Sequence, residues 1–118
     1  MLDRRIKVAF LSTYPPRECG IANFTHDLVS ELKKIPGLEP TVIALSDADY
    51  QYGSDVFFDF KQEDLQGYRK AAERLNGSEI DLLVVEHEYG IFGGKDGSYL
   101  LDLVDRVKLP IVTTLHTV

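Results

Sequence analysis

The stretch IKVAFLSTYPPRECGIANFTHDLVSELKKIPG, residues 6–37, decides the fold of this chain. Its first part, Ile6 to Leu11, is a short apolar run that predicts a buried strand ending before the Pro15-Pro16 pair. Beyond Gly20, apolar residues recur at intervals of three and four and predict one helix, which Pro36-Gly37 ends. The apolar positions of that helix are Ile21, Phe24, Leu28, Leu32 and Ile35.

The rest of the 118-residue chain repeats this alternation of strand and helix. A helix capped by Asp64 is expected in the middle of the chain, and another opens at the glycine-rich loop that ends at Gly97. The nearly continuous apolar character of Ile80–Val85 is typical of a strand that is covered on both faces. The further strands are expected at Thr41–Leu45, Val56–Phe58, Ile80–Val85 and Ile111–Leu115.

This pattern predicts a single α/β domain over residues 1–118. Because βαβ crossovers are right-handed, we expect a Rossmann-like parallel sheet of about five strands, in the order 3-2-1-4-5, with helices on both faces. Such sheets bind ligands beyond the carboxyl ends of the strands, where the order reverses between strand 1 and strand 4. The loop Thr13–Gly20 should therefore lie beside the loop Glu86–Gly97, with His116 close to both.

Charge and cysteine content exclude several classes of partner. The net charge of −6, from 19 acidic and 13 basic residues, repels a phosphate backbone, so nucleic acid is not an expected partner. No apolar run is long enough to predict a membrane span. The single cysteine, Cys19, cannot form an internal disulfide and indicates a reducing compartment, so a cytoplasmic location is expected.

The glycine at the start of the first helix has two interpretations. Gly20 leaves room for a phosphate or diphosphate to approach unpaired backbone N–H groups at the positive end of the helix dipole. Alternatively, it only relieves a tight turn between strand and helix. The dinucleotide fingerprint G-x-G-x-x-G is absent, and Gly94-Lys95 does not complete a P-loop because Asp96 follows it.

Titratable residues offer two further kinds of chemistry. Glu86, His87 and Glu88 end a buried strand, where acid/base catalysis takes place in many enzymes. Strand alternation sends His87 to the face opposite both glutamates, so we do not expect a metal site, and a hydrogen-bonded histidine with solvated carboxylates is an equal interpretation. Cys19 with a nearby histidine would give the nucleophile of a hydrolase, although a lone cysteine beside a turn is more often inert.

Three segments together resemble the N-terminal domain of the family 4 glycosyltransferases, which have the GT-B fold. They are Tyr14-Pro15-Pro16 with Cys19-Gly20-Ile21, the run His87-Glu88-Tyr89-Gly90-Ile91-Phe92-Gly93-Gly94, and Thr114-Leu115-His116-Thr117. The resemblance spans nearly the whole chain, and the middle run is its most specific part. Many members carry two adjacent glycines where this chain has Cys19-Gly20, and Gln is more frequent at the position of Glu86.

The resemblance implies a retaining transferase that moves a sugar from a nucleotide-diphosphate donor to a hydroxyl acceptor, without a metal or another cofactor. It implies that Gly20 and Ile21 bind the donor diphosphate and that His116 is the catalytic residue facing the transferred sugar. The residues implied to face the acceptor or the cleft are Arg17, His87, Glu88, Tyr89, Gly90, Phe92, Gly93 and Gly94.

Family members also have a C-terminal domain that holds the nucleotide, and the sequence here has no counterpart of it. The chain is therefore expected to be the incomplete N-terminal half of a GT-B fold and to be inactive alone. Its last strand should be an exposed sheet edge that a separate C-terminal domain covers or that favours self-association. The alternatives are a free-standing Rossmann-like module that binds a phosphorylated small molecule and, third, a hydrolase that depends on Cys19.

Overall fold

A computed structural model describes residues 5–116 of the chain, which contain a five-stranded parallel sheet. The strand order is β3-β2-β1-β4-β5, which confirms the predicted fold class and order. The order reverses between β1 and β4, so these two strands flank the switch point at which such sheets bind ligands. The strands are β1 (Ile6–Ser12), β2 (Leu38–Ser46), β3 (Val56–Lys61), β4 (Leu82–His87) and β5 (Ile111–Leu115).

Helices connect these strands and lie on both faces of the sheet. They are α1 (Gly20–Leu32), α2 (Leu65–Asn76) and α3 (Tyr99–Arg106), and a 3-10 turn over Lys95–Gly97 precedes α3. The side chain of Asp64 accepts a hydrogen bond from the Gln66 N–H at 3.1 Å, so the predicted cap of α2 is confirmed. Within residues 5–116, none of the helices is long and apolar enough to cross a membrane.

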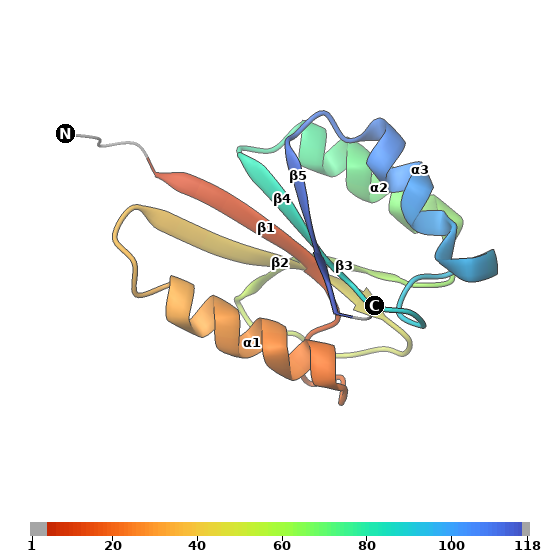
Figure 1. Cartoon of the computed structure of the whole chain (residues 1–118), viewed down its shortest axis with the longest axis horizontal. Coiled ribbons are helices and arrows are strands. Elements are labelled where there is room, and N and C mark those ends of the chain that lie inside the picture. Colours follow the sequence, from red (N-terminus) through yellow and green to blue (C-terminus); the bar gives the residue numbers. More distant parts are fainter. Residues whose placement is uncertain (1–4, 117–118) are drawn as a thin grey trace.

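The sheet separates two apolar cores. Helix α1 packs against one face, and α2 with α3 packs against the other (Figure 1). Alternation along β1 divides its side chains between them, because Phe10 joins the core beneath α1 whereas Leu11 joins the core beneath α2 and α3. The second core is the larger one and contains Tyr68, Leu75 and Leu103 from the two helices.

Helix α1 is shorter than the apolar spacing predicts. Ile35, expected on its inner face, lies beyond the end of the helix and is 49% exposed. Gly37 adopts a left-handed conformation with φ of 83°, and its carbonyl accepts a hydrogen bond from the Ile6 N–H. The chain therefore turns directly into β2, which begins at Leu38 rather than at Thr41 because it pairs with the first residue of β1.

Strand β4 begins and ends two residues later than predicted. Its ladder with β5 continues through Glu86 and His87, which pair with Thr114 and Leu115, so both titratable residues belong to the strand. The expectation that β4 is covered on both faces is confirmed in part, because Leu82 and Val84 pack against the core beneath α1 but are only partly buried. Alternate residues on the α2 side are buried, but Val84 is partly exposed on the other face because α1 packs over β1 and β2.

Tyr68 connects α2 to the loops that follow β3 and β4. This residue is fully buried, and its hydroxyl donates to the Gln62 carbonyl at 2.8 Å and accepts from the Gly93 N–H at 3.0 Å. Burial is the main cause that raises the pKa of Tyr68 to about 12. A neutral phenol is therefore part of the folded structure.

We predict that Tyr68→Phe lowers the free energy of unfolding by about 1–3 kcal/mol at about pH 7, because Gln62 and Gly93 lose their shared partner inside the core. The folded-state pKa of Tyr68 lies above the ordinary tyrosine value, so the stability that the phenol contributes is complete below about pH 10 and is lost as the pH rises above it. The variant should therefore lose less stability than the wild type between about pH 7 and about pH 11. Urea unfolding at both pH values measures this.

The matched control is Tyr89→Phe, because the Tyr89 side chain is 73% exposed and its hydroxyl makes no hydrogen bond to a residue that the structure describes. Burial and the hydrogen bond to Asp55 also raise the pKa of Tyr14, so a residual alkaline loss remains in both variants. A Tyr68→Phe variant with the stability and pH dependence of the control would contradict the prediction.

Candidate functional site

The segments singled out in the sequence meet at the carboxyl ends of β1, β4 and β5. The loop after β1 leads into α1, the glycine-rich loop leaves β4, and His116 follows β5. The His116 N–H donates to the His87 carbonyl at 2.9 Å, and the His116 ring contacts Phe24 of α1 with a centroid distance of 4.7 Å. Thr117, the last residue of the third segment, lies outside the described residues.

The start of α1 has backbone donors that the fold leaves open. Cys19 is the N-cap, and its sulfur accepts a hydrogen bond from the Ala22 N–H at 3.4 Å. The N–H groups of Gly20 and Ile21 come before the first hydrogen bond of the helix and have no partner among residues 5–116. This is the pair of amides for which the sequence predicts a diphosphate.

The structure bears on one of the two interpretations of Gly20, the tight turn. A Cβ atom at this position would meet nothing within 4 Å, and Gly20 does not have a positive φ. A glycine required by a tight turn would show crowding or a left-handed backbone, and Gly20 shows neither. The backbone conformation and the packing therefore do not require a glycine here, and the role of Gly20 toward a ligand stays a prediction.

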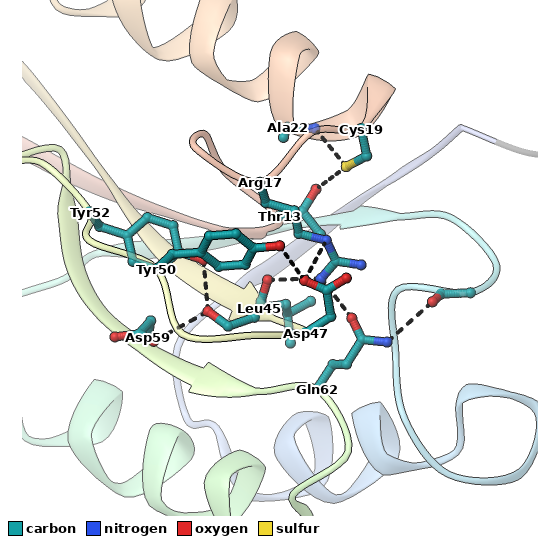
Figure 2. Close-up of polar contacts among 12 residues, drawn as sticks. Thr13, Arg17, Cys19, Ala22, Leu45, Asp47, Tyr50, Tyr52, Asp59 and Gln62 are labelled. Carbon is teal, nitrogen blue, oxygen red and sulfur yellow. Dashed lines mark hydrogen bonds and ion pairs between the residues drawn. The ribbon is translucent and has the colours of Figure 1, made fainter.

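Figure 2 shows that Arg17 holds the first loop onto the ends of β2 and β3. Its Nη1 donates to the Leu45 carbonyl at 3.1 Å and to the Gln62 side-chain oxygen at 2.6 Å, and its Nε lies 3.6 Å from the Asp47 carboxylate. Gln62 in turn donates to the Gly90 carbonyl at 3.4 Å. The Arg17 side chain is only 10% exposed, so these contacts make it a clamp between loops, and its role toward an acceptor stays a prediction.

Asp47 completes this arrangement. The hydrogen bond from Tyr50, with the nearby Arg17 guanidinium as a smaller cause, holds the pKa of the Asp47 carboxyl below its usual value. Asp47 therefore stays ionised beside Arg17 at neutral pH.

His116 is paired with a buried carboxylate. Its Nε2 lies 2.6 Å from Oε1 of Glu86, whose side chain is 1% exposed. The second oxygen of Glu86, Oε2, is buried and has no hydrogen-bond partner among the described residues. Removing one partner of such a pair typically costs about 3–5 kcal/mol, because the other charge is left buried alone.

His87 lies on the opposite face of the sheet from this pair, as strand alternation predicts. Its ring stacks on Phe92 of the core beneath α2 and α3, with a centroid distance of 5.5 Å and an interplanar angle of 18°. The ring of the exposed Tyr89 meets it edge-on at 5.7 Å. The structure therefore brings His116, but not His87, next to Glu86 and α1.

The glycine-rich loop encloses a cavity of about 310 Å³. Six of the residues predicted to face an acceptor line it, namely His87, Glu88, Tyr89, Gly90, Phe92 and Gly94. A larger hollow of about 390 Å³ lies at the opposite end of the strands, where Lys7 pairs with Glu79 at 2.9 Å. It contains none of the predicted site residues.

The predicted site residue Gly93 has a different reason to be glycine. It is buried, and a Cβ atom would overlap the Gln62 carbonyl oxygen. Gly90 and Gly94 have positive φ values of 92° and 81°, so these three glycines are set by the conformation of the loop. Among the predicted glycines, Gly20 alone is unexplained by the backbone or its packing.

The two hydrogen bonds of Cys19 bear on the hydrolase alternative. The sulfur contacts the Ala22 N–H and, at 3.0 Å, the Thr13 hydroxyl, and no histidine within residues 5–116 is hydrogen-bonded to it (Figure 2). A nucleophilic thiol activated by a base requires such a partner. The hydrolase stays a prediction without structural support. The described residues also contain no group of three or more His, Cys, Asp or Glu arranged to hold a metal ion.

Sequence reasoning did not find the contacts of His116 with Glu86 and Phe24. Alternation placed Glu86 on the face opposite His87, which was a partial signal. The pairing of Glu86 with His116, 30 positions further along the chain, depends on the register between β4 and β5. The apolar pattern of the sequence does not specify which residues of the two strands pair.

Comparisons with known proteins give no family for the chain. No protein-family model matches it, and no curated protein or solved structure is significantly similar to it. Its function therefore has to be inferred from the geometry and chemistry of its own residues.

We predict opposite effects of alanine at two glycines of the site. Gly93→Ala should lower the free energy of unfolding by about 1–3 kcal/mol, because the added methyl group overlaps a backbone carbonyl. Gly20→Ala should leave it unchanged or raise it by up to about 1 kcal/mol, because alanine favours the helix and meets no neighbour. Chemical unfolding of both variants beside the wild type measures the difference. Equal destabilisation by the two substitutions would restore the tight-turn interpretation of Gly20.

Proposed function

We propose that the chain is the N-terminal, acceptor-side domain of a retaining family 4 glycosyltransferase. The reaction would transfer a sugar from a nucleotide-diphosphate sugar to a hydroxyl acceptor. One observation carries the proposal: the unpaired amides of Gly20 and Ile21 lie on the helix whose Phe24 contacts His116, at the switch point of the sheet. The three segments that resemble the family meet at this same edge.

Each group has a chemical role in this proposal. When the bond between sugar and diphosphate breaks, negative charge develops on the leaving diphosphate. The amides of Gly20 and Ile21, at the positive end of the α1 dipole, would stabilise that charge. His116 would face the transferred sugar, and the cavity of the glycine-rich loop would receive part of the acceptor.

A lone cysteine indicates a reducing compartment, so we propose a cytoplasmic location. In this family a C-terminal domain holds the nucleotide, and the chain alone should therefore bind donors weakly and transfer no sugar. Sustained sugar transfer by the purified chain would overturn that part of the proposal.

A phosphate-binding module without transferase activity is the second candidate, and the same open amides favour it. A sensor should bind a phosphorylated small molecule tightly by itself, with a clear rise in melting temperature. A transferase domain should bind a diphosphate weakly and should respond to the sugar at His116 as well. The sugar-dependent response therefore separates the two functions.

We predict that nucleotide-diphosphate sugars at millimolar concentration shift the backbone amide resonances of Gly20, Ile21 and His116 in the 15N-labelled chain. The nucleoside diphosphate without sugar should shift only the first two, because in this proposal the sugar, and not the diphosphate, faces His116. Two-dimensional NMR titrations with UDP-, GDP- and ADP-sugars beside the free diphosphates measure this.

The control for this titration is Gly20→Val, whose side chain fills the space above the amides and should abolish the shifts. Glu31→Gln on the exposed face of α1 should preserve them. Donors that leave all three amides unshifted at saturating concentration would refute the proposal, and shifts at Gly20 and Ile21 with tight binding of the free diphosphate would favour the sensor.

The outer edge of β5 exposes apolar side chains and has no neighbouring strand among residues 5–116. Val112 and Leu115 are 51% and 65% exposed. An apolar edge with unpaired backbone groups favours pairing with another chain, so the purified chain should self-associate as its concentration rises. Val112→Lys should shift it toward the monomer, as light scattering coupled to size-exclusion chromatography will show. A wild-type monomer at all concentrations would contradict this prediction.

A further inference from the structure

The His116 ring is held from three sides. Glu86 Oε1 lies 2.6 Å from its Nε2, Phe24 packs edgewise against the ring at an interplanar angle of 77°, and the backbone N–H of His116 is bonded to the strand beside it. A surface histidine without a special role does not need this degree of fixation. The arrangement leaves Nδ1 as the ring atom with free hydrogen-bonding capacity.

The carboxylate of this pair is costly to the fold. Glu86 is 1% exposed, and its Oε2 is buried with no partner among residues 5–116. Replacing a buried ion pair by apolar residues of similar size is often neutral or stabilising. Folding alone therefore gives no reason for a glutamate at this position.

Hydrogen-bonding chemistry gives a reason. An ionised carboxylate only accepts hydrogen bonds, so the hydrogen of a neutral His116 ring must lie on Nε2. Nδ1 is then a bare acceptor, and it is not among the buried atoms without a partner, in keeping with the 16% exposure of the side chain. An acceptor at this position suits the hydroxyl group of a ligand.

We propose that Glu86 is a positioning residue that fixes the orientation and the protonated nitrogen of His116, so that Nδ1 accepts a hydrogen bond from a ligand hydroxyl. The assignment of that hydroxyl to the transferred sugar rests on the proposed function. The fixed orientation of the His116 ring does not depend on the proposed function. Phe24, 44% exposed beside the ring, would offer an apolar surface to the C–H groups of the same sugar.

The first experiment measures the protonated nitrogen directly in the ligand-free chain. Long-range 1H–15N correlation spectra distinguish the two neutral forms of each histidine, and His26 and His87 serve as internal references. The wild type should carry its hydrogen on Nε2 of His116. Glu86→Leu offers the ring no partner and Glu86→Gln offers both a donor and an acceptor, so both variants should give mixed forms.

A control and a second measurement keep this test decisive. Glu31→Gln, an equal change of charge on exposed α1, should leave the His116 signals as in the wild type. Urea unfolding of Glu86→Gln and Glu86→Leu checks that both variants are folded under the conditions of the spectra, since removing one partner of a buried pair typically destabilises the fold. A wild-type ring with its hydrogen on Nδ1, or variants with wild-type ring signals, would overturn the proposal.

The second experiment uses the complete enzyme that the proposed function requires. Glu86→Leu should lower kcat by up to about 100-fold with little change in KM for the donor, since the group that is misplaced acts on the reacting sugar. Absence of transfer by the wild type, together with a ring fixed by Glu86, would refute the transferase and leave the positioning role intact. Transfer by the wild type with unchanged kcat in Glu86→Leu would refute the positioning role alone.

Discussion

Parallel pairing of β1 on both of its edges is the constraint from which the rest of the structure follows. The strand pairs with β2 from Ile6 to Ser12 and with β4 from Val8 to Leu11. Because β4 comes after β3 in the chain, the connection must cross the sheet, which sends α1 to one face and α2 to the other (Figure 1). The gap at the switch point, with the open end of α1 above it, is a consequence of this crossing.

Neutral and charged hydrogen bonds then tie the loops of that edge to one another. Tyr68 joins the loop after β3 to the glycine-rich loop, and Arg17 joins the loop after β1 to the same neighbours through Gln62. These bonds satisfy backbone groups that buried loops otherwise leave unpaired. The loops around the candidate site are therefore held by several hydrogen bonds. Among the described residues, the N–H groups of Gly20 and Ile21 and the Oε2 atom of Glu86 are left without a partner at this edge.

The sequence predicted what depends on short-range periodicity. The Asp64 cap and the division of Glu86 and His87 between two faces follow from patterns within about ten residues. The strand order follows from the alternation of these strands and helices, because βαβ crossovers are right-handed. The predicted end of α1 was wrong at Ile35, because the helix ends at Leu32 and the chain passes through a turn containing Gly37 before β2 begins. The contact of His116 with Glu86 was not predictable, since it depends on how two strands align.

The cap of α1 bears on the diphosphate that we propose at the start of this helix. Cys19 occupies a position that usually belongs to serine, threonine, aspartate or asparagine, and sulfur is a weak acceptor. An aspartate here would place a negative charge at the mouth of the helix and compete with an incoming diphosphate. The Cys19 sulfur instead accepts a hydrogen bond from the Ala22 N–H in the first turn, and a neutral thiol adds no negative charge beside Gly20 and Ile21. The weak cap of α1 therefore adds no negative charge that would repel the proposed diphosphate.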